Sequence, residues 1–501
     1  MFYFDNSINK KIFVSSVLIF FIIVNNHFEV NNPTNLPELL YYNNQTLNLL
    51  ITSKKCPQTL FLYSEFQNYY KSSKNIKQII LKDKNFFVTF FNNDHKYIQY
   101  LDLLENNGLI ESHYLYGKNN IFFYPINNNI SIKNKPFEFR LNKYQKIYRH
   151  LYSQYIFQKN SLYKCYLEMK KLFSEEFNYM PQTFYFPEEG KLIDKIFHNY
   201  SINLNDLWMV KPSSKGEGKG IYFLKSLRNI QYKEYIITKY ITEVHLINGK
   251  KYDLRLYVLI PYLKPLRIYF YKEGIVRIAS EKYSLKKSLI DNRYIHLTNI
   301  DINKSNRNFI RPNTTSDENA NTWNILMYKK YLNKFNIKWS NLRNKIKDII
   351  IKTIISVYNN LIEENKKQNL TEQSFYNILG FDILITNKFN PILIEVNKNP
   401  SMLYLNNLDM VIKSNLIIDT LNLIGIIPFS KKTDEPLKNR FYLTPKKHNE
   451  NIHDAFCELE RFRGGYELIF PTKKNIHLYN KYFKYNNEEN KKFWNLIMSK
   501  K

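Results

Sequence analysis

The sequence places two carboxylates and an amide on what we expect to be neighbouring strands of one hairpin. The segments FDILIT (381–386) and PILIEVN (391–397) are short apolar runs with a few residues between them, as in two paired, buried strands. Glu395 and Asn397 are two residues apart and share one side of their strand, and Asp382 lies on the partner strand. Oxygen-bearing side chains are the ligands that Mg²⁺ prefers. The pattern therefore predicts a magnesium site, with a charged edge strand as the alternative.

A second feature is a glycine cluster in a chain that contains little glycine. Only 12 of the 501 residues are glycine, yet Gly216, Gly218 and Gly220 lie within five residues, and we expect no room for a side chain there. A strand-like segment, IYFL (221–224), follows the cluster, whereas a helix follows a Rossmann or Walker loop. The pattern favours a hairpin tip whose backbone N–H groups cover phosphates, and Lys211 before it would add a positive charge. An ordinary turn is the alternative.

A third group of charged residues lies on strand-like segments. Lys251, Asp253 and Arg255 alternate along the chain and therefore share one face of a strand. Charged groups on an otherwise apolar strand are costly unless they meet ligands or each other. Arg277, on a following strand, could hold a carboxylate through two hydrogen bonds. The set fits either a ligand pocket or a structural ion-pair network.

Together, these features predict a site for ATP and Mg²⁺. They comprise a glycine hairpin, lysines, arginines and a metal hairpin, and no segment is like the catalytic loop of a kinase. Arginines beside metal-bound ATP suit activation of a carboxylate as an acyl phosphate, which an amine then attacks.

The elements that must position these residues predict an α+β fold with mixed sheets, without regular βαβ alternation. We expect strands at 86–91, 121–124, 208–224 (around the glycine loop), 235–279, 381–386 and 391–397. We expect helices over 135–180, ending at Met180-Pro181, and over 341–363 and 410–428, and a mobile loop over 303–321.

The chain is long enough for two or three domains. We expect a leader and linker (1–60), an N-terminal subdomain (61–134), a catalytic domain (135–430, with its ATP and metal half at 236–430) and a basic C-terminal extension (431–501). The apolar run 12–24 is shorter than the ~20 residues of a standard membrane span. A targeting signal or anchor, a membrane contact through this run and a buried helix are the alternatives.

Lysine and arginine outnumber aspartate and glutamate by 73 to 44, which gives a formal charge of +29. Such a charge favours polyanionic partners, although the excess is spread along the chain and also fits an AT-rich genome. We expect no nucleic-acid partner because no base-stacking motif accompanies the charge.

Seven ordered strings resemble the tubulin–tyrosine ligase-like family, an ATP-grasp group. They are WMVKPSSKGEGKGI, TKYI, KKYDLRLYVLI, PLRIYFYKEGIVR, YIHLTNIDINK, GFDILI and PILIEVNKNPSM. The resemblance runs from about residue 135 to 427 and has a weaker echo at 461–471. It implies an ATP-grasp fold preceded by a small N-terminal domain.

The family pattern also implies roles for individual residues. Along ATP it places Lys211, Glu217, Gly218, Lys251 and Asp253, with Thr238, Lys239, Tyr240 and Ile241 at the adenine-side hinge and Thr298 and Asn299 nearby. It places Mg²⁺ on Asp382, Glu395 and Asn397, catalysis on Arg255, Arg277 and Glu395, and the substrate amino acid on Arg277 and Lys304.

The strings DLRLYVL and HLTN are most similar to the glutamylating branch of the family. This resemblance implies a microtubule-associated tubulin polyglutamylase, at the axoneme or basal body in some settings. It would join free glutamate to glutamate side chains in acidic tubulin tails and could need accessory subunits. A ligase for glycine or tyrosine, a non-tubulin acidic acceptor and a non-catalytic microtubule-binding protein are the alternatives. Glu217 and the Ile300-Asp301 pair depart from the family pattern and leave the amino-acid contacts open.

Overall fold

The computed structural model describes residues 84–90, 109–111, 121–123, 146–148, 154–198, 200–201, 203–204, 206–213, 215–216, 218–367, 375–398, 400–425, 429–430, 452, 455–459, 461, 463–484 and 488–499. The leader 1–60 with its apolar run 12–24, most of the N-terminal subdomain 61–134, and Glu217 lie outside these residues.

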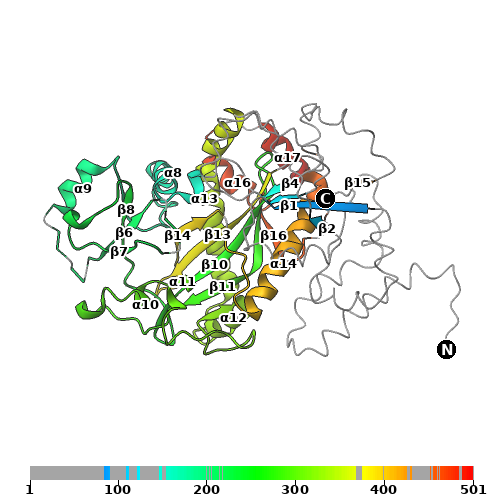
Figure 1. Ribbon diagram of the computed structural model, residues 1–501. Helices are drawn as coiled ribbons and strands as arrows, with labels where there is room; N and C mark the ends of the chain where they lie inside the picture. Colours follow the sequence, from blue (N-terminus) through cyan, green and yellow to red (C-terminus); the bar gives the residue numbers. More distant parts are fainter. Residues whose placement is uncertain are drawn as a thin grey trace, which may run out of the picture.

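The smaller of two sheets forms one side of the molecule, at the left of Figure 1. It is antiparallel, in the order β5–β8–β6–β7. Its strands are β5 (Thr183–Phe186), β6 (Trp208–Pro212), β7 (Tyr222–Phe223) and β8 (Tyr235–Lys239). Helix α9 (Gly190–Phe197) packs Ile193 and Phe197 against Val210 of this sheet. The hairpin of β6 and β7 confirms the predicted strand–glycine loop–strand arrangement.

The larger sheet occupies the centre of Figure 1 and runs in the order β12–β11–β10–β13–β4–β3–β1–β15. Strand β14 also pairs with β13, β16 with β11, β2 with β1 and β9 with β10. The strands are β1 (Lys84–Phe90), β2 (Leu109–Glu111), β3 (Ile121–Phe123), β4 (Lys146–Tyr148), β9 (Leu246–Ile247), β10 (Lys250–Ile260), β11 (Ile268–Ile278), β12 (Thr322–Asn324), β13 (Phe375–Ile385), β14 (Pro391–Asn397), β15 (Phe429–Ser430) and β16 (Tyr466–Phe470). Pairing is antiparallel from β12 to β13 and parallel between β13, β4, β3 and β1, so the predicted α+β fold with mixed sheets is confirmed.

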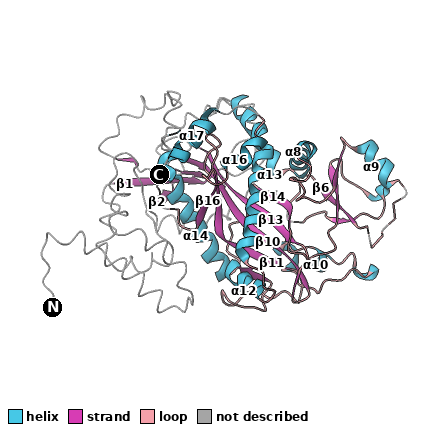
Figure 2. Ribbon diagram, turned by 180° about the vertical axis from the view of Figure 1, so that it is seen from behind, coloured by secondary structure: helices cyan, strands magenta, loops and turns pink. Residues whose placement is uncertain are grey.

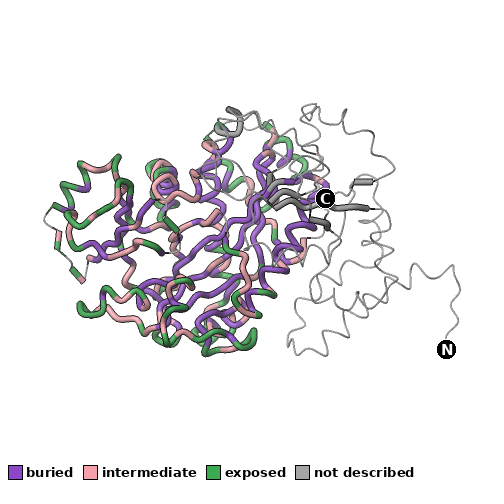
Figure 3. The backbone as a smooth tube through the Cα atoms, viewed as in Figure 1, coloured by how far each residue is buried: buried purple, intermediate pink, exposed green. Residues whose placement is uncertain are grey.

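Two long helices cover opposite faces of this sheet, α14 (Asn407–Ile424) in front in Figure 1 and α13 (Trp339–Lys367) in front in Figure 2. Along β10, Leu254 and Leu256 join the core beneath α13, whereas Tyr257 and Leu259 join the core beneath α14. The sheet strands between the helices are buried (Figure 3). Helix α14 ends at Gly425, whose left-handed φ of 71° suits glycine.

The other helices are α7 (Gln154–Phe157), α8 (Lys159–Leu172), α10 (Arg293–His296), α11 (Ile300–Asn303), α12 (Ile325–Asn333), α16 (Ile476–Tyr479) and α17 (Glu488–Ser499). The predicted helix over 135–180 is wrong in extent, since β4 interrupts it and α8 ends at Leu172. After Leu172 the rings of Phe173 and Phe177 pack edge-on against Tyr482 from the C-terminal part of the chain. None of the described helices is both long and apolar enough to cross a membrane.

The described part of the predicted C-terminal extension is built into the main body. Strand β16 pairs with β11, and the fully buried guanidinium of Arg267 forms an ion pair with the equally buried Glu458 at 2.6 Å. The Asn490 side chain accepts a hydrogen bond from the backbone N–H of Leu266 at 2.7 Å. These residues therefore complete the large sheet and its core.

Candidate active site

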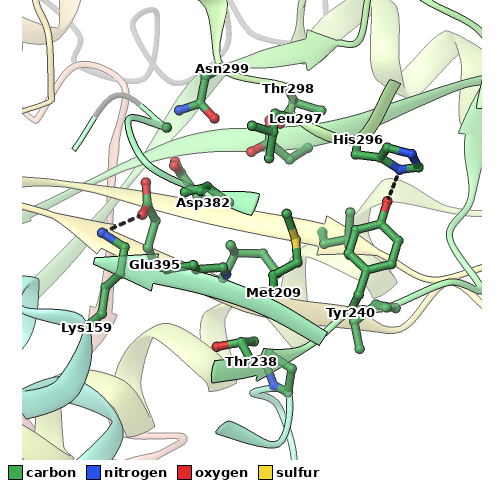
Figure 4. A pocket seen from close by; sticks show the side chains of 18 of the residues that line it. Lys159, Met209, Thr238, Tyr240, His296, Leu297, Thr298, Asn299, Asp382 and Glu395 are labelled. Carbon is green, nitrogen blue, oxygen red and sulfur yellow. Dashed lines mark hydrogen bonds and ion pairs between the residues drawn. The ribbon is translucent and has the colours of Figure 1, made fainter. Parts of the chain in front are cut away.

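A cleft lies between the two sheets, and its empty space, including solvent at the open mouth, is about 830 Å³. Residues from β6 and β8 line one side of it, and residues from β10, β11, β13 and β14 line the other (Figure 4). Thirteen of the residues predicted for the site line this cleft: Lys211, Gly218, Thr238, Lys239, Tyr240, Ile241, Lys251, Asp253, Arg277, Thr298, Asn299, Asp382 and Glu395.

Two lysines are held in the cleft in an environment that disfavours their charge. Burial lowers the pKa of Lys211 to about 8, although the nearby Glu395 opposes the shift. Burial lowers the pKa of Lys251 to about 7, and the positive charge of Lys211 adds to the effect. Without an anion to stabilise them, both amines therefore lose protons near neutral pH.

Two arginines and two aspartates on β10, β11 and β13 form a connected ion-pair network. The strand register places Asp253 opposite Arg277 and Arg255 opposite Asp382. Arg255 donates to Asp382 from Nε at 2.6 Å and from Nη2 at 3.0 Å, and Arg277 donates from Nε to Asp253 at 2.8 Å. Arg277 Nη2 also forms an ion pair with Asp382 at 2.9 Å.

This network affects the two carboxylates in opposite directions. Burial alone would raise the pKa of Asp382, but the guanidinium groups of Arg255 and Arg277 outweigh it and hold that pKa well below its usual range. Burial raises the pKa of Asp253, and its pairing with Arg277 offsets only part of that rise. The set therefore forms an ion-pair network, in which Asp253 and Arg277 line the cleft while Arg255 is absent from its lining.

The predicted metal hairpin has the expected arrangement. Strands β13 and β14 are antiparallel, with Asp382 directly opposite Glu395. The Asn397 amide lies 3.2 Å from Asp382 Oδ2 and 3.4 Å from Glu395 Oε1, so the three side chains converge. The described residues contain no group of three or more His, Cys, Asp or Glu side chains placed to bind a metal, and here the third donor would be an amide.

Two of the three clustered glycines are where a side chain would collide with a neighbour. At Gly218, with φ of 70°, an added Cβ would lie 2.5 Å from Ile302 Cδ1, and at Gly220, with φ of 73°, it would lie 2.2 Å from the Tyr232 hydroxyl. At Gly216 nothing lies within 4 Å, so the prediction of a crowded position is wrong there.

Lys304 is not among the residues that line the cleft. It directly follows α11, and its ammonium group pairs with Asp301 at 2.6 Å on a largely exposed surface. Its predicted contact with the substrate amino acid therefore stays a prediction, as does the role of Asn397, which the lining also omits.

Among the cleft residues that sequence reasoning did not assign to the site are Lys159 and His296. Lys159, at the start of α8, lies 3.6 Å from Glu395 and donates to the backbone carbonyl of Lys215 at 2.9 Å. A lone lysine before a helical pattern carries no signal for this contact. His296 lines the cleft and bonds through Nδ1 to the Tyr240 hydroxyl at 3.0 Å. The HLTN string, which begins with His296, could have indicated this residue, but only its last two residues, Thr298 and Asn299, were given a role near ATP.

Residues 137–434, more than half of the chain, match the model of the tubulin-tyrosine ligase family. The chain belongs to that family. A tubulin monoglutamylase TTLL4 from Mus musculus is 32% identical over 387 residues, which are 66% of this chain and 32% of the relative. A probable beta-tubulin polyglutamylase from Tetrahymena thermophila is 31% identical over 67% of this chain and 30% of its own length. A tubulin polyglutamylase TTLL6 from Homo sapiens is 31% identical over 69% of this chain and 40% of its own length.

The family resemblance predicted from the seven motifs is thereby confirmed. The chain of this tubulin-tyrosine ligase family member spans about a third of the length of the first two of these relatives. The small N-terminal domain that the resemblance implies stays a prediction.

Proposed function

We propose that this tubulin-tyrosine ligase family member is an ATP- and Mg²⁺-dependent tubulin polyglutamylase. It would join free glutamate to the side-chain carboxylates of glutamates in acidic tubulin tails. The proposal is supported by family membership and by relatives named as glutamylases. The observation that carries it is one cleft that combines buried lysines with a facing pair of carboxylates, Asp382 and Glu395.

ATP would lie along the cleft with its phosphates near the two buried amines. Lys211 and Lys251 are largely deprotonated above their lowered pKa values of about 8 and 7, so an arriving polyphosphate would recharge them. The loop that contains Gly218 comes close enough for backbone N–H groups to reach the phosphates without an intervening side chain.

The facing carboxylates of Asp382 and Glu395 fit Mg²⁺, which prefers oxygen ligands. Asn397 donates to both carboxylates through its amide nitrogen, so it would have to turn its amide to offer its oxygen to the ion. Asp382 stays ionised at physiological pH because Arg255 and Arg277 lower its pKa. When bound, Mg²⁺ would neutralise charge on the phosphoryl group that is transferred to the acceptor carboxylate.

The two arginines would serve the acyl transfer. Arg277, which lines the cleft and pairs with Asp253 and Asp382, would meet a substrate carboxylate, whereas Arg255, which is not part of the lining, would support Asp382. The two arginines and two aspartates of the network cancel in charge, so recognition of an anionic substrate depends on the lysines as well. Glutamate would bind through its carboxylates to Arg277 and Lys304 and attack the acyl phosphate through its amine.

The acidic tubulin tail would be attracted by the general positive charge of +29. Exposed charges separated by more than about 8 Å are screened at physiological ionic strength, so binding of the tail should weaken with salt. Accordingly, we propose that the protein acts at microtubules, with accessory subunits as further candidate partners.

The experiment compares labelled glutamate, glycine and tyrosine as substrates. The full chain, purified tubulin, Mg²⁺ and ATP are incubated with one labelled amino acid at a time, and label in the tubulin band is counted. We expect incorporation of glutamate that requires ATP. Incorporation of glycine or tyrosine without glutamate would refute the choice of amino acid, and tubulin binding without any incorporation would favour the non-catalytic alternative.

A further inference from the structure

Three buried polar side chains form a hydrogen-bonded chain at the wall of the cleft, and sequence reasoning gave two of them no side-chain role. The Lys251 amine lies 3.0 Å from the Tyr240 hydroxyl, and that hydroxyl lies 3.0 Å from His296 Nδ1. All three residues line the cleft, and each is less than 10% exposed. Figure 4 shows the Tyr240 hydroxyl directed at the His296 ring.

The hydrogen-bonded chain of Lys251, Tyr240 and His296 connects both sheets. Tyr240 directly follows β8 of the smaller sheet, Lys251 lies on β10 of the larger sheet, and His296 ends α10. The Lys251 amine also lies 4.2 Å from the centre of the Tyr240 ring, which adds a cation–π contact when the amine is charged.

The direction of the hydrogen bonds follows from the donors available. With ATP bound and its amine charged, Lys251 can only donate, so the Tyr240 oxygen accepts from it and the Tyr240 O–H is left to donate to His296 Nδ1 or to the neighbouring Tyr283 hydroxyl. Burial, with the charge of Lys251, lowers the pKa of His296 to about 4, so the ring is neutral at pH 7, and the tautomer that carries its proton on Nε2 accepts at Nδ1. The Phe223 ring packs edge-on against both Tyr240 and His296 and shields the pair from water.

We propose that Tyr240 and His296 are positioning residues that aim the Lys251 ammonium group at the bound nucleotide. A lysine side chain has four rotatable bonds, and its orientation is costly to fix without a partner. The Tyr240 oxygen supplies that partner, and His296 fixes the rotation of the Tyr240 hydroxyl. This inference rests on the proposed function, because it takes the ligand of Lys251 to be ATP.

The test measures ATP binding calorimetrically in four variants of the full chain. Tyr240→Phe removes the hydroxyl and keeps the ring, His296→Phe removes the acceptor, and His296→Asn keeps an acceptor oxygen near the position of Nδ1. Tyr328→Phe is the matched control, since it removes an equally buried hydroxyl, 2.8 Å from that of Tyr252, outside the cleft lining.

We expect Tyr240→Phe and His296→Phe to weaken ATP binding about tenfold, and His296→Asn and Tyr328→Phe to stay within about threefold of the parent chain. In glutamate ligation, the two affected variants should raise KM for ATP and leave kcat within about twofold, because an ammonium that binds phosphate equally in ground and transition states affects KM alone.

Unchanged ATP binding in Tyr240→Phe would overturn the inference, and so would His296→Asn binding as weakly as His296→Phe. If His296→Phe does not fold, as judged by its thermal transition, the Tyr240→Phe result decides. A parent chain that binds no ATP would overturn the proposed function together with this inference. A parent chain that binds ATP alongside an unaffected Tyr240→Phe would overturn only the inference.

Discussion

Binding of ATP to this protein should take up protons, and the amount should depend on pH in a calculable way. At pH 8 an amine with the pKa of Lys251, about 7, is about nine-tenths neutral, and one with the pKa of Lys211, about 8, is about half neutral. A bound polyphosphate would restore both amines to their charged form. We therefore expect an uptake of about 1.4 protons at pH 8, against about 0.3 at pH 6.5.

The sign of the pH dependence follows from linkage. The ATP-bound state holds more protons than the free state, so ATP affinity must fall as the pH rises through the pKa values of the free lysines. With pKa values of about 7 for Lys251 and about 8 for Lys211 in the ATP-free protein, ATP should bind about tenfold more weakly at pH 8 than at pH 7. It should bind about 50-fold more weakly at pH 9 than at pH 8. A phosphate has its second pKa near ~6, so ionisation of the ligand contributes little in this range.

The assay is isothermal titration calorimetry of ATP into the full chain in two buffers of different ionisation enthalpy. The difference between the two observed heats gives the number of protons taken up. Lys251→Met is the control, because only Lys211 then responds and the uptake at pH 8 should fall to about 0.5. Proton uptake near zero at pH 8 in the parent chain would refute the account of the buried lysines, as would an uptake that Lys251→Met leaves unchanged.

Three further predictions concern the metal hairpin, the network and the C-terminal part. Glu395→Gln should reduce glutamate incorporation at least about 100-fold while co-sedimentation with microtubules persists, because a ligand for Mg²⁺ and the ion pair with Lys159 are lost inside the cleft; unaltered incorporation would remove the metal assignment. In Gly380→Ala the new Cβ would lie 3.1 Å from Arg255 Cδ, so kcat/KM should fall about tenfold with the unfolding temperature nearly kept, and a fully active variant would show that Arg255 tolerates displacement. Glu458→Gln leaves Arg267 buried without its partner and should cost about 3–5 kcal/mol in the free energy of unfolding, read from the urea midpoint; an unchanged midpoint would contradict the role given to this pair.

Local periodicity predicted the parts of the site that depend on residues close together in the sequence. Alternation along β14 correctly predicted that Glu395 and Asn397 share a side, and the short connection to β13 predicted that Asp382 lies beside them. The turn alone would place Asp382 opposite Ile394, and a bulge between Asp382 and Ile383 brings Asp382 opposite Glu395, so sequence spacing predicts the pairing of the strands but not this register.

Contacts between distant segments could not be read from spacing. The same-face alternation of Lys251, Asp253 and Arg255 was predicted, but it could not show that Arg255 pairs with Asp382 of β13 rather than with a ligand. The contact of Lys159 with Glu395 likewise depends on how α8 packs beside β14.

The end of α8 and the packing of the C-terminal part likewise depend on contacts between distant segments. Residues after Leu172 have a helix-compatible sequence, but packing of Phe173 and Phe177 on Tyr482 overrides that local preference. The acidic partner of Arg267 lies in a segment whose basic composition predicted only an appended tail.

The central claim is that ATP drives the attachment of glutamate to glutamate side chains of tubulin. Its most direct test is tandem mass spectrometry of tubulin tails after incubation with the full chain, Mg²⁺, ATP and isotopically labelled glutamate. We expect labelled glutamate in isopeptide linkage to a side-chain carboxylate of the tail, present with ATP and absent without it. Tails that carry another amino acid, or labelled glutamate attached at the main-chain terminus alone, would contradict it.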